Sequence, residues 1–109
     1  MLTISGSARV FFCSSSTDMR KSFESLSAIV EREFDVPLTS GAYFVFLNRP
    51  KNRMKVLYWD IDGFALWYKR LEKGRFISDA LGDGLITRQD FILLLEGITP
   101  QKKNRRFHQ

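Results

Sequence analysis

Two spacings of apolar residues run along this chain, and they predict where its strands and helices lie. Residues 8–13 form a short apolar run of β-forming side chains, which predicts a first strand that ends at the serines that follow. Over residues 18–34 the apolar side chains recur every three or four positions, at Met19, Phe23, Leu26, Val30 and Phe34. This spacing predicts an amphipathic helix with one buried stripe, capped by a hydroxyl side chain from residues 14–17.

The middle of the chain is typical of antiparallel strands joined by tight turns. Residues 42–48 are apolar at both alternating sets of positions, which predicts a strand in the centre of a sheet. Turns at 49–52 and at Asp62–Gly63 bound two further strands, over 54–60 and 64–71. If the loop at Asp62–Gly63 has two or four residues, one set of side chains from the two strands lies on a single sheet face: Lys55, Leu57, Trp59, Phe64, Leu66, Tyr68 and Arg70. A three-residue loop would break that parity.

Turn and cap signals organise the C-terminal third. Lys73–Gly74 predicts a turn, residues 75–77 a short edge strand and residues 78–86 a loop. Thr87 and Asp90 resemble a capping box, which predicts a second helix that ends at Gly97. The expected fold class is α+β: a strand, an amphipathic helix, an antiparallel meander of three to four strands and a C-terminal helix. These elements form one domain over residues 1–99, followed by a basic disordered tail over 100–109.

Charge changes this picture because it is unevenly distributed. The net charge of the 109 residues is +5, but residues 49–75 hold eight bases and three acids. Residues 100–109 hold four bases and no acid, whereas the rest of the chain is net negative. Such asymmetry predicts an anionic partner more strongly than the total charge does.

Cations interleaved with aromatic side chains on a sheet suit a nucleic acid. The candidate phosphate-binding residues are Arg20, Lys21, Arg49, Lys51, Arg53, Lys55, Lys69, Arg70, Lys73, Arg75, Lys102, Lys103, Arg105 and Arg106. The candidates for stacking on bases are Trp59, Trp67 and Tyr68. The alternative for each group is structural: cations that keep a hairpin soluble, aromatics packed in the core, and an Arg20–Glu24 ion pair on the helix.

Catalytic and metal-binding patterns are sparse in this sequence. Cys13 is the one cysteine, so the chain can form no internal disulfide and no cysteine-based zinc site. A metal could be held by Asp60 and Asp62 with Glu72 or Glu96, but Asp62–Gly63 is better explained by turn chemistry. We therefore expect no enzyme activity, cofactor or metal. The sequence also has no signal peptide and no apolar run of ~18 residues, which predicts a cytoplasmic protein without a membrane span.

Several motifs resemble one family in their order and spacing. They are TDMRKSF at 17–23, FVF at 44–46, KVLYWD at 55–60, Gly63, KRLEKGRF at 69–76 and LLEGI at 94–98. Together they resemble the TnpB-type accessory protein, the second open reading frame of the insertion-sequence sixty-six family of bacterial transposons. The resemblance spans roughly residues 8–98. It implies a small cytoplasmic protein that is needed for transposition beside a separate transposase, with no known reaction, cofactor or catalytic residue.

Three functions from different classes follow from these observations. The first is a non-catalytic accessory factor of transposition that contacts DNA phosphates through the hairpin and the tail, without reading base sequence. The second is an interaction module that docks on the transposase, on other proteins of the element or on itself, without binding DNA. The third is a nuclease or strand-transfer enzyme, for which the sequence lacks a convincing set of spaced carboxylates. The oligomeric state is left open.

Overall fold

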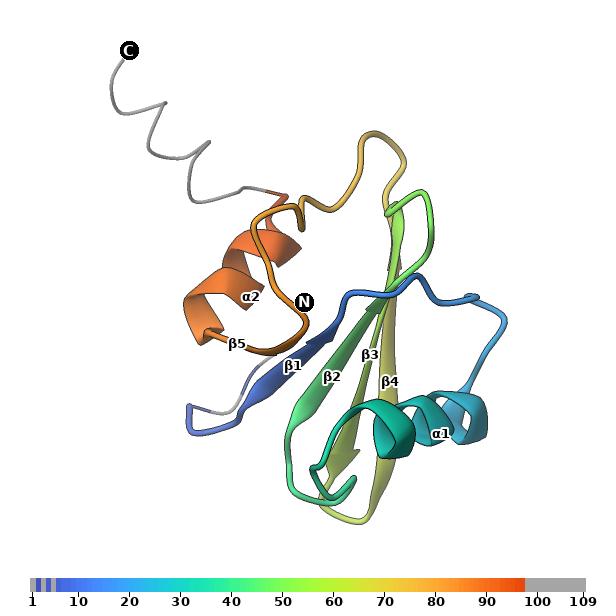
Figure 1. The fold of residues 1–109 in the computed structure, drawn as a ribbon, viewed down its shortest axis with the longest axis vertical. Helices are drawn as coiled ribbons and strands as arrows, with labels where there is room; N and C mark the ends of the chain where they lie inside the picture. Colours follow the sequence, from blue (N-terminus) through green and yellow to red (C-terminus); the bar gives the residue numbers. More distant parts are fainter. Residues whose placement is uncertain (1, 3, 5, 98–109) are drawn as a thin grey trace.

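A single mixed sheet organises the chain, of which the computed structural model describes residues 2, 4 and 6–97. Its elements are β1 (Val10–Cys13), α1 (Phe23–Glu33), β2 (Tyr43–Leu47), β3 (Arg53–Asp60), β4 (Gly63–Arg70), β5 (Gly84–Ile86) and α2 (Arg88–Leu95). The strand order is β4-β3-β2-β1-β5 (Figure 1). β1 and β2 are parallel, and α1 provides the crossover between them; the other neighbouring strands are antiparallel. The predicted α+β class and the β2–β3–β4 meander are confirmed.

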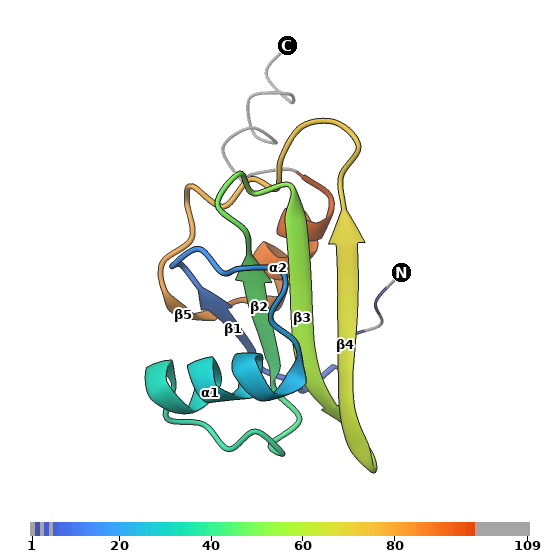
Figure 2. The same cartoon turned by 90° about the vertical axis from the view of Figure 1, so that its right-hand side faces the viewer.

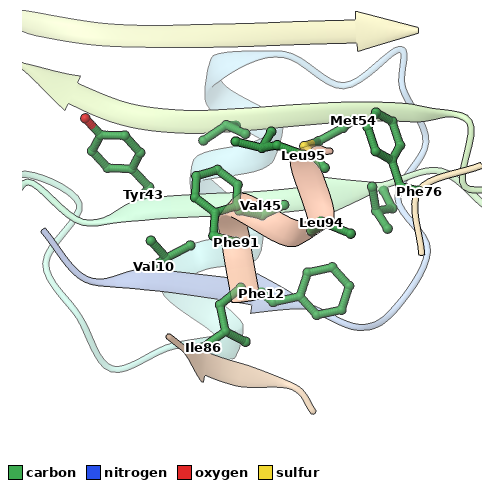
Figure 3. Packing of buried hydrophobic residues seen from close by; sticks show 12 residues of the cluster. Val10, Phe12, Tyr43, Val45, Met54, Phe76, Ile86, Phe91, Leu94 and Leu95 are labelled. Carbon is green, nitrogen blue, oxygen red and sulfur yellow. The ribbon is translucent and has the colours of Figure 1, made fainter. Parts of the chain in front are cut away.

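Each face of the sheet carries one helix, so the central strands are buried on both sides (Figure 2). α1 packs Leu26 and Val30 against Phe44 and Phe46 of β2. On the opposite face α2 places Phe91, Leu94 and Leu95 against side chains of β1, β2 and β3 (Figure 3). All five residues of β2 are buried, as its unbroken apolar run predicts.

The β3–β4 hairpin has the two-residue loop Ile61–Asp62, which gives the predicted side-chain parity. Lys55, Leu57 and Trp59 lie opposite Tyr68, Leu66 and Phe64. The turn is tight, because the Asp62 amide donates to the Asp60 carbonyl across 2.5 Å and Ile61 takes a φ of 59°. A positive φ is costly for a β-branched residue, and the Ile61 side chain is 91% exposed at this tip.

The first helix begins later than its apolar spacing predicts. Residues 18–22 precede α1, so Arg20 and Lys21 are not in a helical turn. Hydrogen bonds of the preceding segment explain the difference: the Thr17 amide donates to the distant Leu47 carbonyl, and the Asp18 carboxylate accepts from the Arg20 amide. Met19 still packs against the α1 side of the core, but from a loop. The N-cap is therefore Ser22 rather than a residue of 14–17.

Two predictions in the C-terminal third are wrong. Residues 75–77 are not a strand; Phe76 reaches the core from a loop, where it is fully buried. The predicted loop over 78–86 ends in β5, which pairs with β1 through three residues and begins at Gly84, at a φ of 97°. The predicted cap of α2 is confirmed, because the Thr87 hydroxyl accepts from the Asp90 amide. Residues 98–109 lie outside the described residues.

Truncating Phe91 to alanine is expected to destabilise the fold by about 3–5 kcal/mol, since it empties a fully buried ring site between α2 and the sheet. Urea denaturation of Phe91→Ala measures this change in the free energy of unfolding. Gln89→Ala, on the exposed side of the same helix, is the control and should change stability by less than about 0.5 kcal/mol. Equal midpoints for the two variants would contradict the described packing of α2.

Candidate nucleic-acid interface

Most of the sequence-predicted cations gather at one end of the sheet, which we call the basic end. The strand directions bring together the ends of β1, β2 and β4 and the start of β3, because Cys13 pairs with Phe46, and Arg53 with Arg70. The connections over 14–22, 48–52 and 71–83 leave the sheet there (Figure 2). The cations on these segments and strand ends are Arg20, Lys21, Arg49, Lys51, Arg53, Lys69, Arg70, Lys73 and Arg75.

Asn48 shapes the turn that carries three of these cations. Its Oδ1 accepts from the Asn52 and Arg53 amides, both at 3.0 Å, and its Nδ2 donates to the Asn52 Oδ1 at 2.7 Å. Lys51 takes a φ of 61° in this turn, and its carbonyl accepts from the Phe76 amide. The Asn52 carbonyl accepts from the Leu71 amide, so the turn and the 71–76 segment are joined by two backbone bonds. These hydrogen bonds fix the backbone positions from which the side chains of the turn's three cations extend.

Lys55 is part of the fold and not of the exposed basic surface. It is 7% exposed, and its Nζ donates to the Met19 carbonyl at 2.7 Å and to the Lys21 carbonyl at 2.6 Å. The ammonium also lies 5.1 Å from the centre of the Tyr68 ring. The sequence interpretation of Lys55 as an exposed phosphate contact did not anticipate this position. Its charge holds the 17–21 segment, and hence Arg20, against the sheet.

Three carboxylates at the basic end offset part of its charge. Asp18 holds the Arg20 guanidinium at 2.6 Å, and this hydrogen-bonded pairing keeps the pKa of the Asp18 carboxyl far below its usual range. Asp79 lies 3.3 Å from Arg75 and 3.6 Å from Lys51, and the hydrogen bond from Arg75, together with the charges of both cations, lowers the pKa of Asp79. A contact of 3.4 Å joins Arg70 to Glu72. The predicted Arg20–Glu24 pair is replaced by Arg20–Asp18, because Arg20 precedes the helix.

The remaining cations of the basic end have no carboxylate within 4 Å among the described residues. They are Lys21, Arg49, Arg53, Lys69 and Lys73. Arg49 and Arg53 line a hollow of about 410 Å³ between the 48–52 turn and the 16–20 segment, with Arg20 on its other side. The same hollow contains the side chain of one acid, Asp18, which Arg20 already neutralises. This arrangement can accept an anion of phosphate size on two uncompensated guanidinium groups.

The aromatic candidates are dispersed over the hairpin. Tyr68 is 49% exposed and lies at the level of Lys55, near the basic end. Trp59 is half-buried near the opposite tip, where it meets the Phe64 ring edge-on at 5.1 Å. Trp67 packs against the core on the α2 side. The structure therefore does not bring the three rings together with the basic end.

The carboxylates considered for a metal are likewise separated. Asp60 ends β3 and Asp62 lies in the β3–β4 loop, whereas Glu72 follows the far end of β4. Glu96 lines a hollow of about 450 Å³ with Lys69, Lys73 and Arg75. Within residues 6–97, no three His, Cys, Asp or Glu side chains are grouped as a metal site would need. In the same part of the chain, neither helix has the length and apolar character needed to cross a bilayer.

The tail cations Lys102, Lys103, Arg105 and Arg106 lie outside the described residues. The last described residue, Gly97, lines the same hollow as Lys69, Lys73 and Arg75. Gly97 therefore lies at the basic end. The sequence analysis did not predict the roles of Asn48 in the turn or of Asp79 in the ion pairs. A signal in the sequence existed only for Asn48, which together with Asn52 flanks the turn at Pro50.

Comparison with known proteins identifies relatives of this chain. The model of the family described as IS66 Orf2 like protein matches residues 8–105. A Sinorhizobium fredii protein, y4hO, is 35% identical over 86 residues, covering 79% of this chain and 75% of the relative. A second protein of the same organism, y4jC, is 30% identical over 100 residues, covering 90% and 86%. No solved structure matches the chain.

Replacing Lys55 by methionine is expected to destabilise the protein by about 1–3 kcal/mol, because the Met19 and Lys21 carbonyls lose their buried donor. Lys69→Met is the matched control, since it removes the same charge from an exposed position on the neighbouring strand. Urea unfolding of both variants measures the difference. If Lys55→Met were no less stable than Lys69→Met, the buried ammonium would not be holding the 17–21 segment.

Proposed function

Because the chain belongs to the IS66 Orf2-like protein family, we propose that it is an accessory protein of DNA transposition that holds DNA phosphates at its basic end. Membership of the family implies the accessory role in transposition. Contact with DNA and the absence of catalysis are the further parts of the proposal. DNA, the transposase and other proteins of the element are the proposed partners.

The observation that carries the DNA contact is the pair of uncompensated guanidinium groups, Arg49 and Arg53, at one hollow. Lys69 and Lys73 extend the same charge along the end of β4 and the loop that follows it. A duplex carries a phosphate charge every few ångströms, so a strip of fixed cations gains from releasing the counterions of several phosphates at once. The hydrogen bonds around Asn48 support this role by fixing the turn before DNA arrives.

Such contacts would position DNA without reading its sequence. Phosphate contacts fix register and orientation, whereas base recognition needs side chains that reach a groove. The charged side chains of α1 are three acids, Glu24, Glu31 and Glu33, and one base, Arg32, so this helix has no basic face to enter a groove. α2 begins with Arg88, Gln89 and Asp90 and is followed by Glu96. The proposal therefore assigns sequence recognition to another protein of the element.

Neutralising Arg49, Lys51 and Arg53 together, each to glutamine, is expected to weaken duplex binding. The slope of log affinity against log salt should become shallower by about 2–3, since each lost phosphate contact removes about 0.9. Fluorescence anisotropy with a labelled duplex across a salt series measures both quantities. The control is Arg9→Gln with Arg32→Gln, which removes charge from the opposite end of the sheet and from the last turn of α1.

An unchanged slope in the triple variant would reject phosphate binding at this turn. Absence of DNA binding by the native protein at low salt would instead favour the basic end as a docking surface for an acidic patch of the transposase. Co-purification of the two proteins after nuclease treatment would then identify that contact.

Asp79→Asn is expected to act in the opposite direction and raise DNA affinity by about two- to fivefold at low salt. Asp79 is ionised at neutral pH, since its pKa is lowered from an already acidic value, and it competes with phosphate for Arg75 and Lys51. Anisotropy at pH 7 measures the gain, and Asp35→Asn, an exposed acid beyond α1, is the control. A loss of affinity in Asp79→Asn would mean that the two ion pairs organise the binding surface.

A further inference from the structure

Strand β4 is an open edge of the sheet. It has eight residues, Gly63–Arg70, and within the described part of the chain only β3 pairs with it. It contains no proline, and its exposed side includes Phe64 (36% exposed) and Tyr68 (49%). Long unpaired edges are normally shortened, covered or blocked, because their free amides and carbonyls can pair with another strand. The opposite edge, β5, has only three residues.

We propose that β4 pairs antiparallel with β4 of a second copy of this chain, about a twofold axis at Leu66, to form one continuous sheet across a homodimer. A twofold axis perpendicular to the sheet keeps each residue on its own face, so residues directly opposite each other must share parity. Registers centred on Ala65, Leu66 or Trp67 satisfy this condition. The side chains of β4 distinguish among them.

The register centred on Leu66 matches the exposed aromatic residues. It sets Phe64 directly opposite Tyr68 of the second copy, on the α1 side of the sheet, and it does so twice by symmetry. Directly opposed aromatic side chains are favourable cross-strand pairs. A centre at Trp67 would instead set Phe64 against Arg70, and a centre at Ala65 would set Asp62 against Tyr68.

The same register also places opposite charges beside each other at both ends of the strand pair. Asp62 in the β3–β4 loop falls opposite Arg70 of the second copy, whose contact to its own Glu72 is exposed and 3.4 Å long. The register centred on Trp67 would oppose Asp62 to Glu72, which repel. Parallel pairing in register would align Arg70 with Arg70 and Lys69 with Lys69. Opposite charges favour the antiparallel arrangement and like charges oppose the alternatives.

The exposed Ile61 side chain would contact an apolar side chain of the second copy in this arrangement. Continuing the register past the strand brings it beside Leu71 of the second copy. In the single chain the Ile61 side chain is 91% exposed and lies on a backbone of positive φ. An apolar side chain held at a strained and solvated position is accounted for if a second chain covers it.

Cysteine cross-linking tests the register directly. At a twofold centre the two Leu66 Cα atoms lie about 4.5–5.5 Å apart, within the range that a disulfide spans. Leu66→Cys is therefore expected to form a disulfide dimer under mild oxidation at micromolar protein concentration, at least tenfold faster than Ala65→Cys. Cys13 is not expected to compete, because it is buried and burial raises its pKa. Faster cross-linking of Ala65→Cys, or cross-linking of neither variant, would overturn the proposal.

Swapping the charges of Asp62 and Arg70 tests the proposed strand pairing without altering buried residues. Analytical ultracentrifugation should give a micromolar dimer for the native protein, as a small interface implies. Arg70→Asp should weaken the dimer by about tenfold at low salt, since the pair occurs twice. Arg70→Asp combined with Asp62→Arg should restore the native dissociation constant to within about threefold.

Phe64→Ser removes one aromatic partner of the proposed Phe64–Tyr68 pair and should weaken the dimer, and Leu85→Ser is its matched control. It removes an exposed apolar side chain (63% exposed) from β5, the other edge of the sheet, and should leave the dimer unchanged. A monomer at all concentrations, or an equal effect of Leu85→Ser and Phe64→Ser, would overturn the proposal. The result is independent of DNA binding, because these measurements are made without DNA.

Discussion

Strand β2 is apolar on both faces, so each face must be covered by other elements of the fold. Tyr43–Leu47 is entirely buried, so neither a single helix nor an open sheet could cover it. α1 supplies one cover as the crossover between β1 and β2, and α2 supplies the other after the chain has passed through the hairpin. Phe76, buried from a loop, completes the α2 side. β5 and α2 both contribute buried side chains to this second core.

That topology also explains why charge accumulates at one end. A parallel pair joined by a helix and an antiparallel meander bring three connections to the same end of the sheet. The motif at residues 17–21, the turn at 48–52 and the loop after β4 are far apart in sequence, yet backbone bonds and the Lys55 ammonium join them. A buried ammonium is stable here because two carbonyls and the face of the Tyr68 ring solvate it in place of water. The charge of Lys55 is therefore structural, whereas those of Arg49 and Arg53 remain available.

The two proposed surfaces use different parts of the hairpin. Phosphate contact depends on the turn before β3, and self-pairing depends on the outer edge of β4. Antiparallel pairing would direct the two basic ends away from each other on opposite sides of the dimer. A protein of this shape would hold two phosphate tracts at once, which increases the effective concentration of each for the other. Asp79 and Asp18 moderate the attraction by occupying part of the available cations.

The amino-acid sequence by itself determined the α+β class, the central buried strand, the hairpin faces and the cap of α2. These features follow from local periods and turn chemistry, which act between residues close in sequence. The sequence also showed that the positive charge is segregated. Only the tertiary structure decided which cations face solvent, because the burial of Lys55 and the pairing of Lys51 with Asp79 depend on segments tens of residues apart. It likewise decided that α1 begins at Phe23 and that Phe76 is a core residue, since long-range hydrogen bonding and packing outweigh local pattern there.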